Sequence, residues 1–117
     1  MRATSATARV RLDRALPQQR KLSEELLQLH VEFADADIDI ALTFLSLARF
    51  DFETREYEHA ARLLMNARRA SETVTGMLTR LPGEHANRIR ARLVKLQAAI
   101  GETARLAHKD AGSAAAR

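Results

Sequence analysis

Residues 41–74, with the sequence ALTFLSLARFDFETREYEHAARLLMNARRASETV, decide the fold of this chain. Large apolar residues and alanines recur every three or four positions on each side of a polar interruption at 53–56. Such spacing places them on one face of an α-helix. The stretch therefore predicts two helices joined by a short turn, and its pattern describes packing, with no recognisable catalytic chemistry.

The helix that enters this hairpin has two apolar flanks. The first contains Leu22, Leu26, Leu29, Phe33, Ala36, Ile40, Phe44 and Leu47, and the second contains Leu27, Val31, Ile38, Leu42 and Leu45. Two flanks predict two neighbours, so we expect the first to line the bundle and the second to meet a partner. Asp37 is the misfit, because an unpaired buried carboxylate is costly. Either the helix breaks near residues 35–37, with an aspartate as the new cap, or Asp37 meets a cation such as Arg68 or His30.

Two further apolar rows follow the turn. The row after residue 54 contains Tyr57, Ala60, Ala61, Leu64, Ala67, Ser71, Val74, Leu78 and Leu81, and the last row contains Ile89, Leu93, Leu96, Ile100, Thr103 and Ala107. Pro82 and Gly83 separate the rows, as expected of a helix stop. The predicted fold is all-α, an antiparallel up-and-down bundle of three long helices over about residues 18–50, 54–81 and 84–108. A break in the first helix would make four.

Composition bounds the domain organisation. The 117 residues suffice for one domain with one core, which we place at 17–109, between a disordered basic tail at 1–16 and a disordered tail at 110–117. The chain contains no cysteine, which favours a reducing compartment, so we expect a cytoplasmic protein. It also lacks an apolar run of the roughly 18 residues that a membrane span requires.

The net charge of +4 conceals an uneven distribution. Residues 1–21 carry six basic and one acidic residue, 22–58 carry two basic and ten acidic residues, and 59–109 carry ten basic and three acidic residues. The acidic first helix is expected to pack beside basic later helices. The acidic residues Glu32, Asp35 and Asp39 would then pair with arginines of the second half. The alternative is a basic face that binds nucleic acid or anionic lipid.

The central hairpin resembles a tetratricopeptide (TPR) repeat at Phe44, Leu47, Ala48, Tyr57, Ala60, Leu64 and Ala67. The resemblance covers residues 41–74, and two positions depart from it. Asp51 replaces an aromatic residue and Glu72 replaces the closing proline, so the second helix should continue to about residue 81. No second copy of the repeat is present. The resemblance therefore implies a single TPR-like clasp within a bundle, without the concave surface of a repeat array.

Candidate chemistry is sparse. Glu56 and His59 have the spacing of a helical di-iron ligand pair, but such a site needs a second pair and two more carboxylates. We therefore expect a solvated helix surface there, with no catalytic residues, no metal and no cofactor, and a protein that is not an enzyme.

The surplus apolar flank predicts a protein-protein interaction module, either an adaptor or a homodimer. The candidate partner-binding residues are Leu27, Val31, Ile38, Leu42 and Leu45, with Phe50 and Phe52 at the turn. The alternative is a nucleic-acid-binding bundle that uses Arg62, Arg69, Arg88, Arg92 and Lys95 together with the basic amino-terminal tail. A third option, a basic last helix lying on an anionic membrane, is the least favoured.

Overall fold

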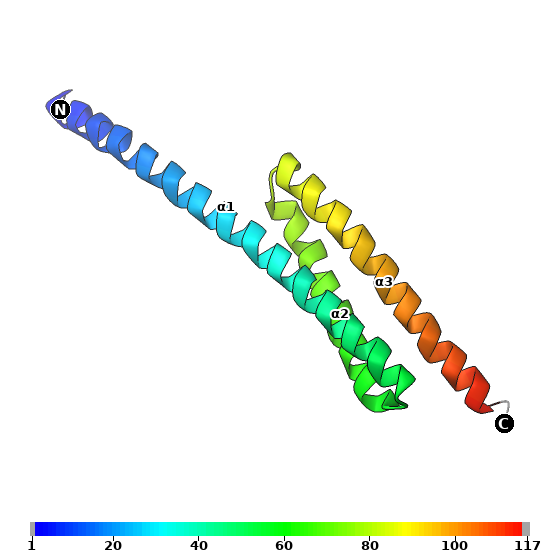
Figure 1. Cartoon of the computed structure of the whole chain (residues 1–117). Coiled ribbons are helices and arrows are strands. Elements are labelled where there is room, and N and C mark those ends of the chain that lie inside the picture. The colour runs from blue at the N-terminus through cyan, green and yellow to red at the C-terminus, as the bar shows by residue number, and fades with distance from the viewer. Residues whose placement is uncertain (1, 116–117) are drawn as a thin grey trace. The chain divides into compact units, whose positions relative to one another are not determined.

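The computed structural model describes the backbone of residues 2–115 and the side chains of residues 16–109. Within that part of the chain the elements are α1 (Arg2–Glu53), α2 (Tyr57–Met77), a short 3-10 helix η1 (Leu78–Arg80) and α3 (Gly83–Ala115) (Figure 1). The predicted all-α fold with three helices is confirmed. The chain divides between His30 and Val31 into two units, which are treated separately below.

The first unit contains the amino-terminal part of α1. Residues 2–16, which belong to the segment predicted as a tail, lie within the bounds of this helix, and so does Pro17. The side chains of residues 1–15 lie outside the described part, as do those of the second predicted tail, 110–117. From residue 16 onward, the leucines of this unit are exposed, except Leu27, which is half-buried.

The second unit is a bundle of the remaining part of α1 with α2 and α3. Helix α2 runs antiparallel to both of its neighbours, which gives the predicted up-and-down order (Figure 1). One row of side chains from each helix builds the core. From α1 these are Val31, Ala34, Ile38, Ala41, Leu45, Ala48 and Phe52; from α2, Ala60, Leu63, Leu64, Ala67, Ser71 and Val74; from α3, Ala86, Ile89, Leu93, Leu96, Ile100 and Thr103. The apolar row predicted for α3 is therefore confirmed.

The core-facing row of α1 differs from the predicted one. Phe33, Ile40 and Leu47 of the first flank are exposed, whereas Val31, Ile38 and Leu45 of the second flank are buried. Alanines alternate with branched residues along the buried row, since Ala34, Ala41 and Ala48 are fully buried. Small side chains let neighbouring helices approach closely, and close packing of interiors favours such an arrangement. The prediction that the larger residues face the bundle was wrong for this reason.

Helix α1 is continuous through Asp37, so the predicted break at residues 35–37 does not occur. Because the core row lies on the other flank, Asp37 is half-buried at its edge instead of facing the centre. A carboxylate that reaches solvent avoids most of the cost of burial, and no break is needed to relieve it.

The turn between α1 and α2 closes on Arg55. This residue has φ 66°, the left-handed conformation typical of the residue that follows the C-cap of a helix. The Glu56 amide donates to the Asp51 carbonyl at 2.7 Å and the Arg55 amide donates to the Phe52 carbonyl at 3.3 Å. These two bonds form a Schellman motif, which satisfies carbonyls at the end of α1.

The second turn follows the pattern expected from the sequence. As predicted, helix α2 extends beyond Glu72; it ends at Met77 and is followed by η1, and Leu81 is extended ahead of Pro82. Helix α3 then begins with an Ala86 amide that donates to the Pro82 carbonyl at 2.8 Å.

Candidate functional site

Ion pairs join α1 to α3 near the start of α3. Arg88 binds the carboxylate of Asp35 with two hydrogen bonds, of 3.1 and 2.7 Å, and Arg92 donates to the same carboxylate at 2.7 Å. Arg92 also donates to Asp39. The predicted pairing of acidic residues on the first helix with arginines of the second half is confirmed for Asp35 and Asp39. These four side chains fix the register between α1 and α3.

The same contacts shift the pKa values of Asp35, Arg88 and Arg92. The hydrogen bonds from Arg88 and Arg92 hold the pKa of Asp35 below its usual value, although partial burial acts in the opposite direction. The pKa of Arg88 is raised by its hydrogen bond to Asp35, and that of Arg92 by its bonds to Asp39 and Asp35. Every shift stabilises the charged form, as in a structural ion pair, and none produces a group poised to exchange protons near neutral pH.

A second cross-link between α1 and α3 was not predicted. Arg49 donates through Nη2 to Glu102 at 3.2 Å and through Nε to the Thr103 hydroxyl at 3.4 Å. Thr103 is fully buried, and its hydroxyl donates to the Ala99 carbonyl at 2.8 Å. Arg49 is the one basic residue between Leu22 and Thr54, which is the signal in the sequence that could have identified it.

The residues proposed for nucleic-acid binding are divided by the fold. Arg62 and Arg69 lie exposed on α2, and Lys95 lies exposed on α3. Arg88 and Arg92 are paired with Asp35 and Asp39, so the guanidinium groups that a phosphate would bind already hold carboxylates. The five positions therefore do not form one basic surface of unpaired cations.

The two phenylalanines near the end of α1, Phe50 and Phe52, differ in their exposure to solvent. Phe52 is buried in a cluster with Ala48, Ala60 and Leu63, against which Phe44 and Ala107 pack. The ring of Tyr57 lies 6.5 Å from that of Phe52, with the planes inclined at 42°. Phe50 is not a member of this cluster and is 61% exposed. Of the two residues, Phe50 is therefore the one available to a partner.

The spacing of Glu56 and His59 does not lead to a metal site in the described structure. Both side chains are exposed, and His59 Nδ1 contacts the carboxylate of Asp51 across the turn. Among the described residues, no group of three or more His, Cys, Asp or Glu side chains could hold a metal ion. The described helices also include none that is long and apolar enough to cross a membrane.

The residues proposed for partner binding on α1 are mostly in the core. Val31, Ile38 and Leu45 are buried by α2 and α3, Leu27 is half-buried, and Leu42 is exposed. A second copy could reach the three buried side chains only if the bundle opened. Within this bundle they form the core, and any docking surface on α1 must use other residues.

The exposed apolar side chains of α1 form such a surface. Phe33, Ile40 and Leu47 succeed one another at intervals of seven and are 56%, 49% and 48% exposed. Ala36 lies between Phe33 and Ile40 on the same face, Phe50 follows Leu47, and both are exposed. We call these five residues the outer face of α1. At 3.6 residues per turn, Ile40 lies roughly 160° around the helix from the buried Ile38 and roughly 100° from the buried Ala41.

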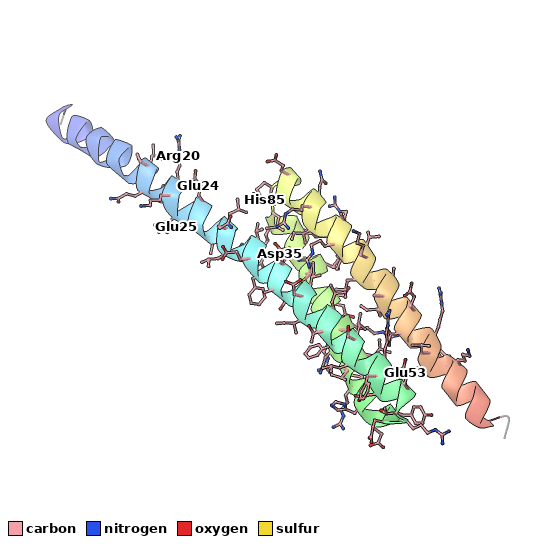
Figure 2. The ribbon with its side chains drawn as sticks, viewed as in Figure 1. Arg20, Glu24, Glu25, Asp35, Glu53 and His85 are labelled. Atoms are coloured by element: carbon pink, nitrogen blue, oxygen red, sulfur yellow. The ribbon has the colours of Figure 1, made fainter. Side chains whose placement is uncertain are left out.

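Acidic residues accompany the outer face along the helix. Figure 2 labels Glu24 and Glu25 on the earlier part of α1, and Asp35 and Glu53 farther along the same helix. Between residues 22 and 48, α1 carries six acidic residues and no lysine or arginine; the acidic residues are Glu24, Glu25, Glu32, Asp35, Asp37 and Asp39. The part of the outer face up to Leu47 therefore lies on a segment of α1 that carries acidic residues and no lysine or arginine.

Comparison with known proteins identifies no relative of this chain. No protein-family model, no curated protein and no solved structure matches this chain.

Proposed function

We propose that this chain is a non-enzymatic protein-interaction module that binds an α-helix of a partner protein on the outer face of α1. The observation that carries the proposal is the exposure of Phe33, Ile40 and Leu47 in one row of a helix whose core row is already buried. A row of large apolar side chains on a surface favours a macromolecular partner.

The spacing of the row favours a helical partner in particular. Intervals of seven, with Ala36, Thr43 and Phe50 each three residues after a member of the row, match the heptad of a helix that packs knobs into holes. A groove-binding strand or a flat surface would not select this repeat. The bundle supplies rigidity, because Val31, Ile38 and Leu45 anchor the opposite side of the same helix.

The central hairpin fits this role as a scaffold. The resemblance of residues 41–74 to a TPR repeat remains a prediction, and it is supported by the full burial of Ala48, Ala60 and Ala67, the small residues expected at a close helix crossing. In our proposal the hairpin holds α1 straight and leaves its outer face uncovered.

Nucleic-acid binding is the less favoured function. Of the five residues predicted for it in the bundle, Arg62, Arg69 and Lys95 are exposed, whereas Arg88 and Arg92 are paired with aspartates. The side chains of residues 1–15, in the basic tail that this function would also use, lie outside the described residues. Steeply salt-dependent binding to duplex DNA or RNA would promote this alternative, and absence of retention on heparin at low salt would remove it.

The proposal is tested by amide chemical shifts of the full chain during titration with a synthetic amphipathic helix. The peptide carries leucine and isoleucine at the seam and glutamine at the flanking positions. We expect the largest shift changes at Phe33, Ile40 and Leu47, and small changes near Val94, an exposed apolar residue of α3 that serves as a control. Saturable changes near Val94 without changes on α1, or no saturable change, would reject the proposal.

A further inference from the structure

The chemistry of the partner helix follows from the residues that flank the outer face. In a two-helix contact, the positions immediately beside the apolar seam meet their counterparts on the other helix and set partner choice. On one side of the outer face these positions are Glu32, Asp39 and Ser46, and on the other they are Asp37, Phe44 and Asp51. Four of the six are acidic, and none is basic.

The bundle does not reverse this charge. Arg92 neutralises Asp39 in part, but the Asp39 side chain remains 66% exposed. Asp37 is half-buried at the edge of the core, and His59 contacts Asp51 from α2. Arg49, on the same helix, points to α3, where it binds Glu102 and Thr103. Between residues 31 and 48, α1 itself carries no lysine or arginine beside these acidic residues.

A second copy of the chain is a poor occupant for the same reason. In a parallel pair, Glu32 of one helix would face Asp37 of the other. In an antiparallel pair, the row of Glu32 and Asp39 would face itself. Both orientations bring carboxylates together, and like charges across a helix contact select against that partner.

We infer that the occupant of the outer face is an amphipathic helix of another protein with lysine or arginine on both sides of its apolar seam. This inference rests on the proposed function and specifies its partner. Basic flanks convert each acid-to-acid contact of a self-pair into an ion pair, while the seam supplies apolar contact with Phe33, Ile40 and Leu47.

The test compares three peptides with the same leucine and isoleucine seam and with lysine, glutamine or glutamate at the flanking positions. We expect the full chain to bind the lysine peptide about tenfold more tightly than the glutamate peptide at low salt, because several weak surface ion pairs add up. Isothermal titration calorimetry gives the affinities. The advantage should shrink as salt is raised, since exposed pairs are screened.

Matched variants connect this preference to the outer face. The double variant Glu32→Gln with Asp37→Asn removes two flanking charges and should reduce the advantage of the lysine peptide several-fold. The double variant Glu58→Gln with Glu72→Gln removes two exposed charges from α2, changes the net charge equally, and should preserve the advantage.

The outcomes separate the two proposals. Equal binding of all three peptides at the outer face would overturn the basic partner and retain helix docking. Tight self-association of the chain in sedimentation, abolished by Ile40→Gln, would also overturn the basic partner, in favour of a second copy. Failure of every peptide to bind at the outer face would overturn the proposed function and this inference together.

Discussion

Ile38 and Ile40 are two residues apart on α1, yet Ile38 is completely buried and Ile40 is 49% exposed. The same side chain therefore occurs in two environments on one helix. Ile38 belongs to the row that packs against α2 and α3, and Ile40 belongs to the outer face. The pair separates the contribution of the bundle core from that of the proposed docking surface.

Truncation of the two isoleucines should have different effects on stability. Ile38→Ala should lower the free energy of unfolding by about 2–4 kcal/mol, because it removes buried methyl groups and leaves a cavity. Ile40→Ala should change it by no more than about 0.5 kcal/mol, as is usual for surface positions. Urea denaturation followed by circular dichroism measures both. Equal losses for the two variants would contradict the assignment of the core row.

Enlarging a buried alanine of α1, instead of truncating a large residue, provides a second test of the core row. Ala41→Leu should destabilise the bundle by about 1–3 kcal/mol, because Ala41 is fully buried and the added atoms overfill the helix contact. Ala36→Leu places the same side chain on the exposed outer face and serves as the control. Thermal unfolding should show a lower midpoint for the first variant alone. A tolerated leucine at position 41 would show that the helices are not in close contact there.

Replacement of the turn residue Arg55 by glycine should stabilise the folded chain. A residue other than glycine in the left-handed conformation carries a conformational cost, so Arg55→Gly should raise the free energy of unfolding by about 0.5–1 kcal/mol. Arg55→Ala keeps that cost and serves as the control. If glycine at position 55 lowers stability as much as it would within a helix, Arg55 is not the terminating residue of α1.

The ion pairs of Asp35 should make stability depend on pH in the acid range. The pKa of Asp35 is lowered in the folded chain by its hydrogen bonds to Arg88 and Arg92, so the folded state binds its proton less readily than the unfolded state. This contribution is complete above the ordinary value of 3.8 and disappears as the pH falls through the folded pKa.

The variant Asp35→Asn isolates this effect. It should unfold at a lower urea concentration than the natural sequence at pH 7, and the difference should shrink as the pH is lowered below 3.8 and through the folded pKa of Asp35. Glu72→Gln, which removes one exposed carboxylate from α2, is the control for the loss of a negative charge. A gap between Asp35→Asn and the natural sequence that is equal at both pH values would mean that the ion pairs do not contribute.

The sequence predicts the core-facing row of α3 because this helix leaves little choice, whereas the row predicted for α2 includes Tyr57 and Ala61, which are exposed. On α3, one narrow apolar row from Ile89 to Thr103 faces the core, and the dipeptide Pro82-Gly83 marks the turn ahead of it. The charge asymmetry along the chain likewise predicts the pairing of Asp35 and Asp39 with arginines, although not with Arg88 and Arg92 specifically.

Helix α1 is different because both of its flanks have helical spacing. Periodicity alone cannot rank them, and side-chain size favours Phe33, Ile40 and Leu47 as the core. The decisive feature is the recurrence of Ala34, Ala41 and Ala48, which allows close approach to neighbouring helices. The existence of a surplus apolar flank therefore follows from the sequence, whereas its position depends on how closely the helices pack.

Binding of the lysine-flanked peptide to Ile40→Gln tests the proposed docking surface most directly. The substitution leaves the charge unchanged and removes apolar contact at the centre of the outer face. We predict at least about tenfold weaker binding than to the natural sequence, from the lost burial of an isoleucine, with an unchanged urea midpoint. Undiminished affinity for Ile40→Gln, in a chain that remains folded, would show that the outer face of α1 is not the binding surface.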